Sequence, residues 1–554
     1  MSKLALQQFK GIIPKIPPKL LNSNNAQIAD NCRLDRGHLE SWQSMSKVGD
    51  LTKTGDIQTI HLFADQYWFH WAEDVDVVKA PIAGDTEEKT VFTVNDGNTT
   101  KPKITDSTAA TSGGSGDIDN YPTTYYNLGI PRPASALTAA NSPSCDEADQ
   151  ETVVYIYTYV NEYGFEGPPS PPSNSVDRCS GDTVDLSNME TGPDGNYKTS
   201  EWGKRVYRTV SGIEDTEYQF VMNVGIASTS ATDSLDTDEL GEIIPSMDWI
   251  APPDDLQGIV ALPNGIMAGF SGKDLYFSEP YIPSAWPTEY SLSTDEPIVG
   301  LGWFGTSLVV CTEGVPYLVS GSHPANMSMS YLGVHQACVS KRGIVSIGPY
   351  GVLYPSPDGL VMVTSDGAKV ITSGILTRGQ WQSYSPESVK GYDYNGQYFG
   401  FYNNGTEKKG FVLDPSDPEN GFKPLNIYAN AGFTDLETDT LYLVTDNDTD
   451  GTYDELMQWE GGTGKLSYRW KSKVFTIPNM NFTCCQVIGE SYNDLTFKLY
   501  ASGQVIFTTN VTDGKVFRLP GGDKHREFEI ELTGTDIVNE VYIATSIMEL
   551  HSFG

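Results

Sequence analysis

The chain is poor in basic residues. Its 554 residues include 36 Lys and Arg against 72 Asp and Glu, which gives a formal net charge of −36. Charge-driven binding to nucleic acid requires clustered Lys and Arg that neutralise phosphates, and the basic pairs here, such as Lys204–Arg205 and Lys341–Arg342, are isolated. The composition therefore excludes such binding. Two interpretations of the acidity stay open: a charge that keeps the protein soluble, or a surface past which DNA slides without sticking.

Long apolar runs are absent as well. No run of about 18 apolar residues occurs, so we expect no membrane-spanning helix. The segment Met1–Lys10 lacks a basic stretch followed by an apolar core, and we therefore expect no signal peptide.

Cysteine is scarce and scattered. There are seven, an odd number, and none forms a C-x-x-C pair. This pattern favours a reduced protein assembled in the cytosol, and it argues against a disulfide scaffold or a zinc site. One local exception is open, because Cys145 and Cys179 flank one predicted sandwich domain.

Catalytic motifs are also missing. The sequence has no G-x-S-x-G elbow and no H-E-x-x-H motif. The Gly-rich stretch ending at Gly464–Lys465 fails the phosphate-loop pattern, since Trp459 occupies the position of its first glycine. The seven histidines are dispersed. We therefore predict that the protein is not an enzyme and needs no cofactor, with calcium as the one candidate discussed below.

What the sequence does contain is a repeated β-hairpin. In residues 252–290, two apolar runs flank Asn264–Gly265, a pair typical of a type I′ turn because both of its central residues need positive φ. Similar hairpins follow at a spacing of about 40 to 45 residues, which matches a four-stranded propeller blade. They lie at Ile57–Val78, Leu308–Leu318, Gly351–Val363, Tyr398–Leu413 and Leu441–Trp459. The pattern predicts an all-β protein with a propeller of about six blades, and a stack of sandwiches is the alternative.

Composition shifts divide the chain into five predicted parts. The Pro-rich start reads as an extended arm with a short helical turn from Ser23 to Cys32. Several short strands after Glu151 suggest an inserted sandwich resembling fibronectin type III. The predicted parts are an N-terminal arm (1–50), a first propeller segment (51–134), the inserted β-sandwich (135–250), the remaining blades (251–471) and a small C-terminal β-domain (472–554).

One loop has the chemistry of a metal site. Asp446, Asp448 and Asp450 alternate before Gly451, which could place three carboxylates on one concave face. Met457 stands where an EF-hand would have its bidentate glutamate, so that motif is excluded. A calcium loop of the DxDxDG type is one interpretation, and a solvated Asp/Asn turn is the other.

A series of short motifs occurs in order along almost the whole chain. They are Phe9–Pro14, Ala26–Trp42, Tyr157–Ser173, Lys204–Arg208, Leu262–Gly265, Tyr276–Pro280, Ala285–Pro287, Phe517–Pro520 and Ala544–Leu550. Their order is more specific than any one of them, and together they resemble the tail nozzle proteins (tail tubular protein B-like) of short-tailed bacteriophages.

This resemblance implies a structural virion protein rather than an enzyme. It implies a homohexamer at the tail tip, assembled in the host cytoplasm, that contacts the tail adaptor protein and the tail fibres or tailspikes. Double-stranded DNA would pass through it during ejection without specific binding. The alternative is a secreted β-propeller lectin or a glycan-degrading adhesion protein.

Overall fold

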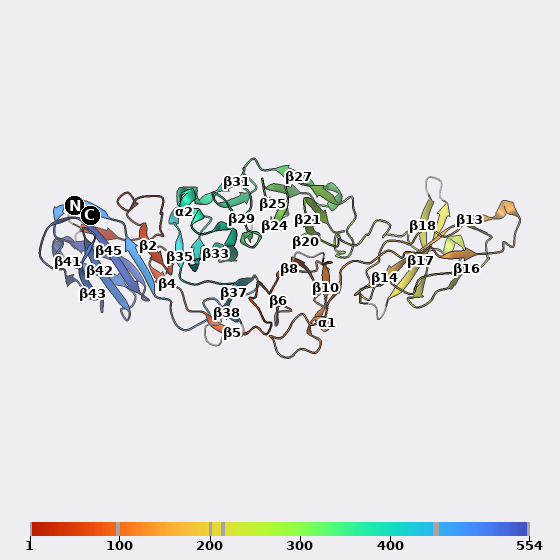
Figure 1. The fold of residues 1–554 in the computed structure, drawn as a ribbon, viewed down its shortest axis with the longest axis horizontal. Helices are drawn as coiled ribbons and strands as arrows, with labels where there is room; N and C mark the ends of the chain where they lie inside the picture. Colours follow the sequence, from red (N-terminus) through yellow and green to blue (C-terminus); the bar gives the residue numbers. More distant parts are fainter. Residues whose placement is uncertain are drawn as a thin grey trace.

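The structure is a computed structural model, and it describes residues 3–95, 100–198, 202–211, 216–348, 350–446 and 454–550. The predicted all-β class is confirmed, with 45% of residues in strands and 7% in helices. The chain is elongated, and three parts lie in a row (Figure 1). We call them the terminal domain, which holds both chain ends, the ring in the middle, and the module (residues 135–250) at the far end.

The terminal domain combines strands from both ends of the chain. β1 pairs with β46 and β2 pairs with β39, so the first residues are built into sheets with the last ones. Residues 26–30 form strand β2, which corrects the helical turn predicted there. The strands are β1 (Lys3–Leu6), β2 (Ala26–Asp30), β3 (Cys32–Arg33), β4 (Glu40–Ser41), β39 (Tyr468–Ser472), β40 (Phe475–Met480), β41 (Cys484–Gly489), β42 (Leu495–Ala501), β43 (Gln504–Asn510), β44 (Phe517–Arg518), β45 (His525–Gly534) and β46 (Val538–Ala544).

The middle of the chain contains seven small antiparallel sheets within the described ranges. In chain order they are β6 (Thr59–Phe63) with β7 (Tyr67–Trp71); β8 (Asp74–Lys79), β9 (Thr90–Asn95), β10 (Lys103–Thr105) and β11 (Tyr126–Asn127); β20 (Gln257–Ala261), β21 (Met267–Ser271), β22 (Asp274–Phe277) and β23 (Ser291–Ser293); β24 (Ile298–Phe304), β25 (Ser307–Thr312), β26 (Tyr317–Ser320) and β27 (Ser328–Tyr331); β28 (Val345–Ile347), β29 (Gly351–Ser356), β30 (Gly359–Thr364) and β31 (Gly367–Val370); β32 (Lys390–Tyr394), β33 (Gln397–Asn403), β34 (Lys408–Leu413) and β35 (Lys423–Leu425); and β36 (Ala431–Asp435), β37 (Thr440–Thr445) and β38 (Glu455–Gln458) with β5 (Ser46–Asp50).

The first strands of these seven sheets contact one another in a cycle. The order is β6, β8, β20, β24, β28, β32 and β36, and β36 contacts β6 again. Each neighbouring pair of sheets encloses its own cluster of buried apolar side chains, which is where most of the folding free energy of such sheets originates. The last sheet is completed by β5 from the N-terminal region, so the two ends of this part of the chain are joined through one sheet.

The hairpin predicted around Asn264–Gly265 is present as β20 and β21. The turn differs from type I′: Gly265 has φ +82°, whereas Asn264 is not among the positive-φ residues. Leu262 and Ile266 close the turn through a backbone hydrogen bond of 2.8 Å. Residues 263–265 therefore form a three-residue loop, longer than a type I′ turn, in which only the glycine adopts the left-handed conformation.

The module consists of three sheets around one apolar core. Tyr155, Tyr157 and Val206 are fully buried in that core, together with Val184 and Leu186 from the opposite sheet. The strands are β12 (Thr138–Ala140), β16 (Val184–Ser187) and β19 (Ala231–Asp233); β13 (Glu151–Val153) and β15 (Val176–Arg178); and β14 (Tyr155–Val160), β17 (Gly203–Ser211) and β18 (Thr216–Gly225).

Helices are few and short. They are α1 (Ser107–Thr111), α2 (Arg378–Gln382) and α3 (Ile547–Leu550), with the 3-10 turns η1 (Glu147–Asp149), η2 (Thr237–Glu239), η3 (Pro324–Asn326), η4 (Lys341–Gly343), η5 (Ile371–Gly374), η6 (Pro386–Ser388) and η7 (Pro418–Asn420). In the described ranges no helix has both the length and the apolar character needed to cross a membrane.

Candidate functional surfaces: an acidic module and a polar ring centre

The predicted calcium loop is only partly visible. Asp448 and Asp450 lie outside the described residues. Asp446 is described, and its carboxylate accepts hydrogen bonds from Asn430 Nδ2 and from Lys408 Nζ, the latter at 3.0 Å. Within the described residues, no group of three or more His, Cys, Asp or Glu could hold a metal ion. The described part of the loop thus shows Asp446 bound to protein groups. Because Asp448 and Asp450 are not described, the calcium site stays a prediction.

One pair of cysteines is oxidised. Cys145 and Cys179 form a disulfide bond across 34 residues of the module. This confirms the local exception that the sequence left open for these two cysteines. The free cysteines in the described residues are all buried: Cys32, Cys311, Cys338, Cys484 and Cys485.

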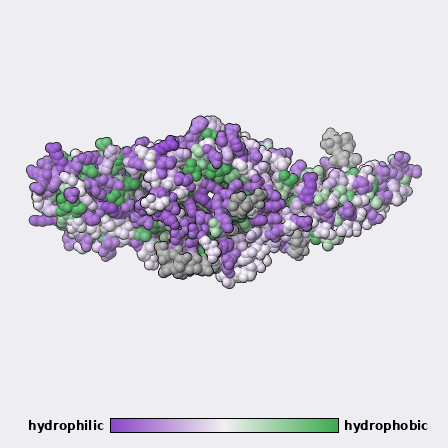
Figure 2. Space-filling view, in the orientation of Figure 1, coloured by the Kyte–Doolittle hydropathy of each residue, from purple (hydrophilic) through white to green (hydrophobic). Residues whose placement is uncertain are grey.

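The module is the most acidic part of the chain. Residues 135–250 contain 21 Asp and Glu against 5 Lys and Arg, a formal charge of −16 in about a fifth of the sequence. By contrast, residues 1–50 contain 4 acidic and 7 basic residues. In Figure 2 the outer end of the module is hydrophilic on the face shown. The negative charge of the protein is therefore unevenly distributed along its length.

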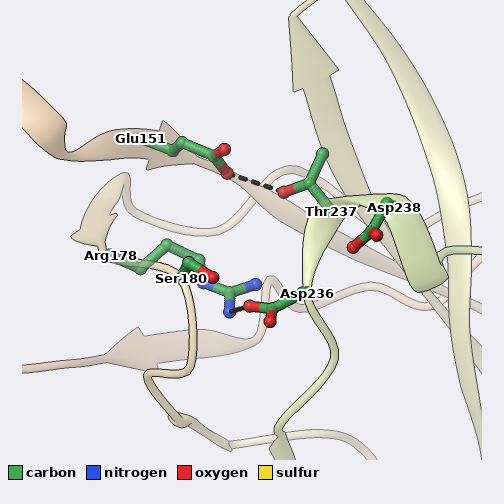
Figure 3. Close-up of a pocket in the computed structure, with 6 residues that line it drawn as sticks. All are labelled: Glu151, Arg178, Ser180, Asp236, Thr237 and Asp238. Atoms are coloured by element: carbon green, nitrogen blue, oxygen red, sulfur yellow. Dashed lines mark hydrogen bonds and ion pairs between the residues drawn. The ribbon is translucent and has the colours of Figure 1, made fainter.

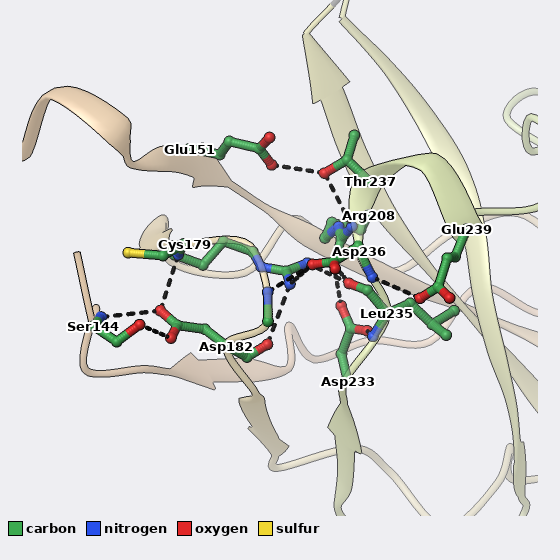
Figure 4. A network of polar contacts seen from close by, with 12 residues as sticks. Ser144, Glu151, Cys179, Asp182, Arg208, Asp233, Leu235, Asp236, Thr237 and Glu239 are labelled. Atoms are coloured by element: carbon green, nitrogen blue, oxygen red, sulfur yellow. Dashed lines mark hydrogen bonds and ion pairs between the residues drawn. The ribbon is translucent and has the colours of Figure 1, made fainter. Parts of the chain in front are cut away.

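The basic side chains of the module all bind other groups of the protein. Arg208 and Asp233 form an ion pair of 2.6 Å in which both side chains are 0% exposed. Arg178 donates to the backbone oxygens of Leu235 (2.7 Å) and Asp182 (3.2 Å). Figure 4 shows the surrounding network, with Arg208, Asp233 and Asp182 labelled. The other three bind as follows: Lys204 to Ser228 O, Arg205 to Glu166 and Glu242, and Lys198 to Glu162 and Asp106.

Hydrogen bonds also hold one acidic group of this network, Asp182, in its charged form. Asp182 accepts from the Ser144 hydroxyl (2.6 Å) and from the Cys179 backbone N–H (2.9 Å). These bonds lower the pKa of Asp182 to about 2. Burial lowers the pKa of Lys204 to about 8. At neutral pH the module therefore presents carboxylates to solvent with little compensating positive charge.

A shallow pocket of about 360 Å³ opens beside this network. Its lining residues are Glu151, Arg178, Ser180, Asp236, Thr237 and Asp238 (Figure 3). Thr237 donates its hydroxyl to Glu151 (2.7 Å), and Arg178 lies 3.6 Å from Asp236. The pocket is lined by carboxylates, hydroxyls and the Arg178 guanidinium, and none of its lining residues is aromatic or apolar.

A second polar cluster lies where the first strands of the ring meet. Lys341 Nζ binds Asp74 (3.1 Å) and Asp76 (2.5 Å). Arg342 forms an ion pair with Asp74 and donates to the Thr59 hydroxyl (2.6 Å). Burial alone would raise the pKa of Asp74, but the guanidinium of Arg342 and the ammonium of Lys341 lower it. The turn before β28 is thereby tied to β6 and β8 on other sheets.

The same region holds a third cation. Lys390, the first residue of β32, donates to Asn430 O (2.5 Å) and to Gln58 Oε1 (3.1 Å). Burial lowers the pKa of Lys390 to about 8. A space of about 160 Å³ remains beside these groups, lined by residues of four sheets, among them Gly258, Leu301 and Tyr392, and by the turn before β28. The centre of the ring is therefore largely filled by side chains.

Sequence reasoning missed both clusters. Lys341–Arg342 was noted only as an isolated basic pair, and its partners Asp74 and Asp76 lie more than 260 residues earlier. A basic pair directly before an apolar strand, in a chain with so few cations, is the one sequence signal that could have indicated a structural role.

Comparisons with known proteins add little. No protein-family profile matches the chain, and no curated protein matches it. Among solved structures, it is similar to the extracellular domain of a putative hybrid two-component system from B. thetaiotaomicron, with 7% sequence identity over 92% of this chain and 78% of that chain. The TM-score is 0.18, and the likeness carries no argument about fold or function.

Proposed function

We propose that this protein is a structural virion protein that forms the distal tail tube, or nozzle, of a short-tailed bacteriophage. In this proposal six copies surround a channel at the tail tip through which the genome is ejected. The copies contact the tail adaptor protein and the tail fibres or tailspikes, and the ring of copies is assembled in the host cytoplasm. The motifs that resemble nozzle proteins are the basis of the proposal.

We further propose that the ring is a β-propeller of seven blades, one more than the sequence spacing suggests, and that the module is a fibronectin-III-like insertion. The cycle of contacts between first strands and the seven apolar clusters between neighbouring sheets support the propeller. Pairing of β5 with β38 would close it. Because ion pairs of Lys341 and Arg342 fill its centre, DNA would pass between copies and not through one chain.

The distribution of charge is the single observation that favours a DNA conduit. A wall that binds phosphates would release counterions and hold the DNA. The module has 21 acidic residues, and its five basic residues are bound to protein groups. Such a surface repels phosphate, so DNA would move past it without being held.

Imaging of intact particles tests the proposal. Cryo-electron microscopy of the virions that carry this chain should show a six-fold ring of it at the tail tip, with module carboxylates facing the channel. The purified protein should also fail to retard duplex DNA at low salt. A location away from the tail, or a channel wall of neutral or basic residues, would overturn the proposal.

A secreted adhesion protein or lectin is the second candidate. The disulfide between Cys145 and Cys179 favours an oxidising environment, which a secreted protein and a released virion share. Binding to a glycan array, with no assembly into particles, would support this candidate over the nozzle.

A further inference from the structure

The module is joined to the ring by two chain segments that run close together. Gly129 on the outgoing segment has φ +92°, and a Cβ there would lie 2.7 Å from the Cβ of Ala251 on the returning segment. Trp286 of the ring fixes the return, because its backbone N–H donates to Ile250 O (2.8 Å). Two adjacent linkers alone would form a hinge, so the orientation of the module depends on the contacts beside them.

Asp106 makes the central polar contact at this joint. It precedes helix α1 in the ring and is 2% exposed. Its Oδ1 accepts from the backbone N–H groups of Thr108 and Ala109, both at 3.0 Å, and so caps α1. Its Oδ2 faces the module and accepts from the hydroxyl of Tyr163 (2.5 Å) and from Lys198 Nζ (3.0 Å). One carboxylate therefore serves both parts of the molecule.

Other contacts surround this carboxylate. Lys198 also binds Glu162 (3.1 Å), and its Nζ lies 4.7 Å from the centre of the Tyr163 ring. Tyr163 and Phe165 pack on an apolar cluster of the ring that includes Ile104. The backbone N–H of Asn127 donates to Asn196 O (2.7 Å), and the Asn196 side chain donates to Tyr125 O (2.9 Å). The joint thus combines apolar packing with a mostly buried group of ion pairs.

We propose that Asp106 is a latch that locks the acidic module to the ring in one orientation, so that the two parts move as one rigid body. Loss of the carboxylate would leave the mostly buried Lys198 with Glu162 as its one remaining acidic partner, and the module would swing on its two linkers. This inference does not depend on the proposed function, because it concerns only contacts within one chain.

Asp106→Asn is the decisive variant. Asparagine caps a helix about as well as aspartate, so α1 keeps its N-cap while the charge that faces the module is lost. The matched control is Asp119→Asn, because among the hydrogen bonds of the described residues the Asp119 carboxylate accepts only from Ser115 and Asn120 of its own loop. Lys198→Met breaks the same contact from the module side and leaves the cap untouched.

The measurement is the distance between spin labels on exposed Ser187→Cys in the module and Ser322→Cys in the ring, in full-length protein diluted with unlabelled chain. We expect a narrow distribution for the parent and for Asp119→Asn, and a distribution at least twice as wide for Asp106→Asn and Lys198→Met. Unchanged widths in the last two would overturn the latch, as would equal broadening by the control. If Asp106→Asn lost its native circular dichroism, the result for Lys198→Met would decide.

Discussion

The buried ion pair in the module gives the sharpest test of how this part of the chain is stabilised. Asp233 accepts hydrogen bonds from Arg208 (2.6 Å), from the Tyr155 hydroxyl (2.8 Å) and from the Leu235 backbone N–H (2.9 Å). Asp233→Asn keeps the shape of the side chain and removes its charge. Arg208 would then be an uncompensated cation in a site from which solvent is excluded.

Breaking a buried pair in this way costs about 3–5 kcal/mol, because the remaining charge is not solvated. At about 1.4 kcal/mol for each factor of ten, the opening equilibrium of the module should shift by roughly two to four orders of magnitude. The double variant Arg208→Met with Asp233→Leu removes both charges, and we expect it to recover much of the loss.

Native-state hydrogen exchange of the β14, β17 and β18 amides measures this shift directly. The control is Asp185→Asn, since Asp185 is exposed and accepts only from the Thr232 hydroxyl among the hydrogen bonds described. A surface change of this kind should alter stability by less than about 0.5 kcal/mol. Equal exchange rates in Asp233→Asn and Asp185→Asn would refute the reasoning.

Three further predictions concern the disulfide, a buried histidine and the ring centre. Cys145→Ser opens a 34-residue loop and should lower the free energy of unfolding by about 3–4 kcal/mol, because the unfolded chain gains conformational entropy. Reductant should lower the melting temperature of the parent but not of the variant. Burial lowers the pKa of His70 from 6.5 to about 4, so the unfolded chain takes up a proton first: stability is complete above pH 6.5 and falls as the pH drops toward 4. His70→Gln should weaken that dependence in urea unfolding at pH 7 and 5, and an unchanged slope would contradict it. Lys341→Met should lower the free energy of unfolding by about 1–3 kcal/mol in the same assay. Lys369 is exposed, and Lys369→Met should have no measurable effect.

Local patterns in the sequence predicted individual strands well. The alternation from Lys204 to Val210 lies inside β17 (Gly203–Ser211), and the hairpin at Asn264–Gly265 is β20 with β21. In the hairpin a glycine at positive φ decides the turn. In β17 the predicted strand is present but the predicted alternation is not, because Val206–Thr209 are buried in succession and the register shifts between Val206 and Tyr207. Glu166, within one of the nozzle-like motifs, has a structural explanation: it accepts from Thr158 and Tyr207, both at 2.7 Å.

Contacts between distant segments were not predictable in this way. The helical turn predicted near residue 26 is strand β2, because its partner β39 lies more than 400 residues later and outweighs local propensity. The ion pairs of Lys341 with Asp74 and Asp76 have the same origin. No local periodicity reveals such residues, because they join elements that lie far apart in the sequence.

The positions of the buried basic residues help to explain why the protein is so acidic. Arg208 lies in the module core, Lys341 in the ring centre and Lys198 at the joint between them. If the negative charge served solubility alone, the scarce basic residues could be scattered over the surface at little cost. Instead, several connect separate sheets and leave the outer carboxylates uncompensated. Neutralising exposed acids such as Asp185 should therefore change how the surface interacts with DNA and not how the chain folds, whereas removal of these three cations should do the reverse.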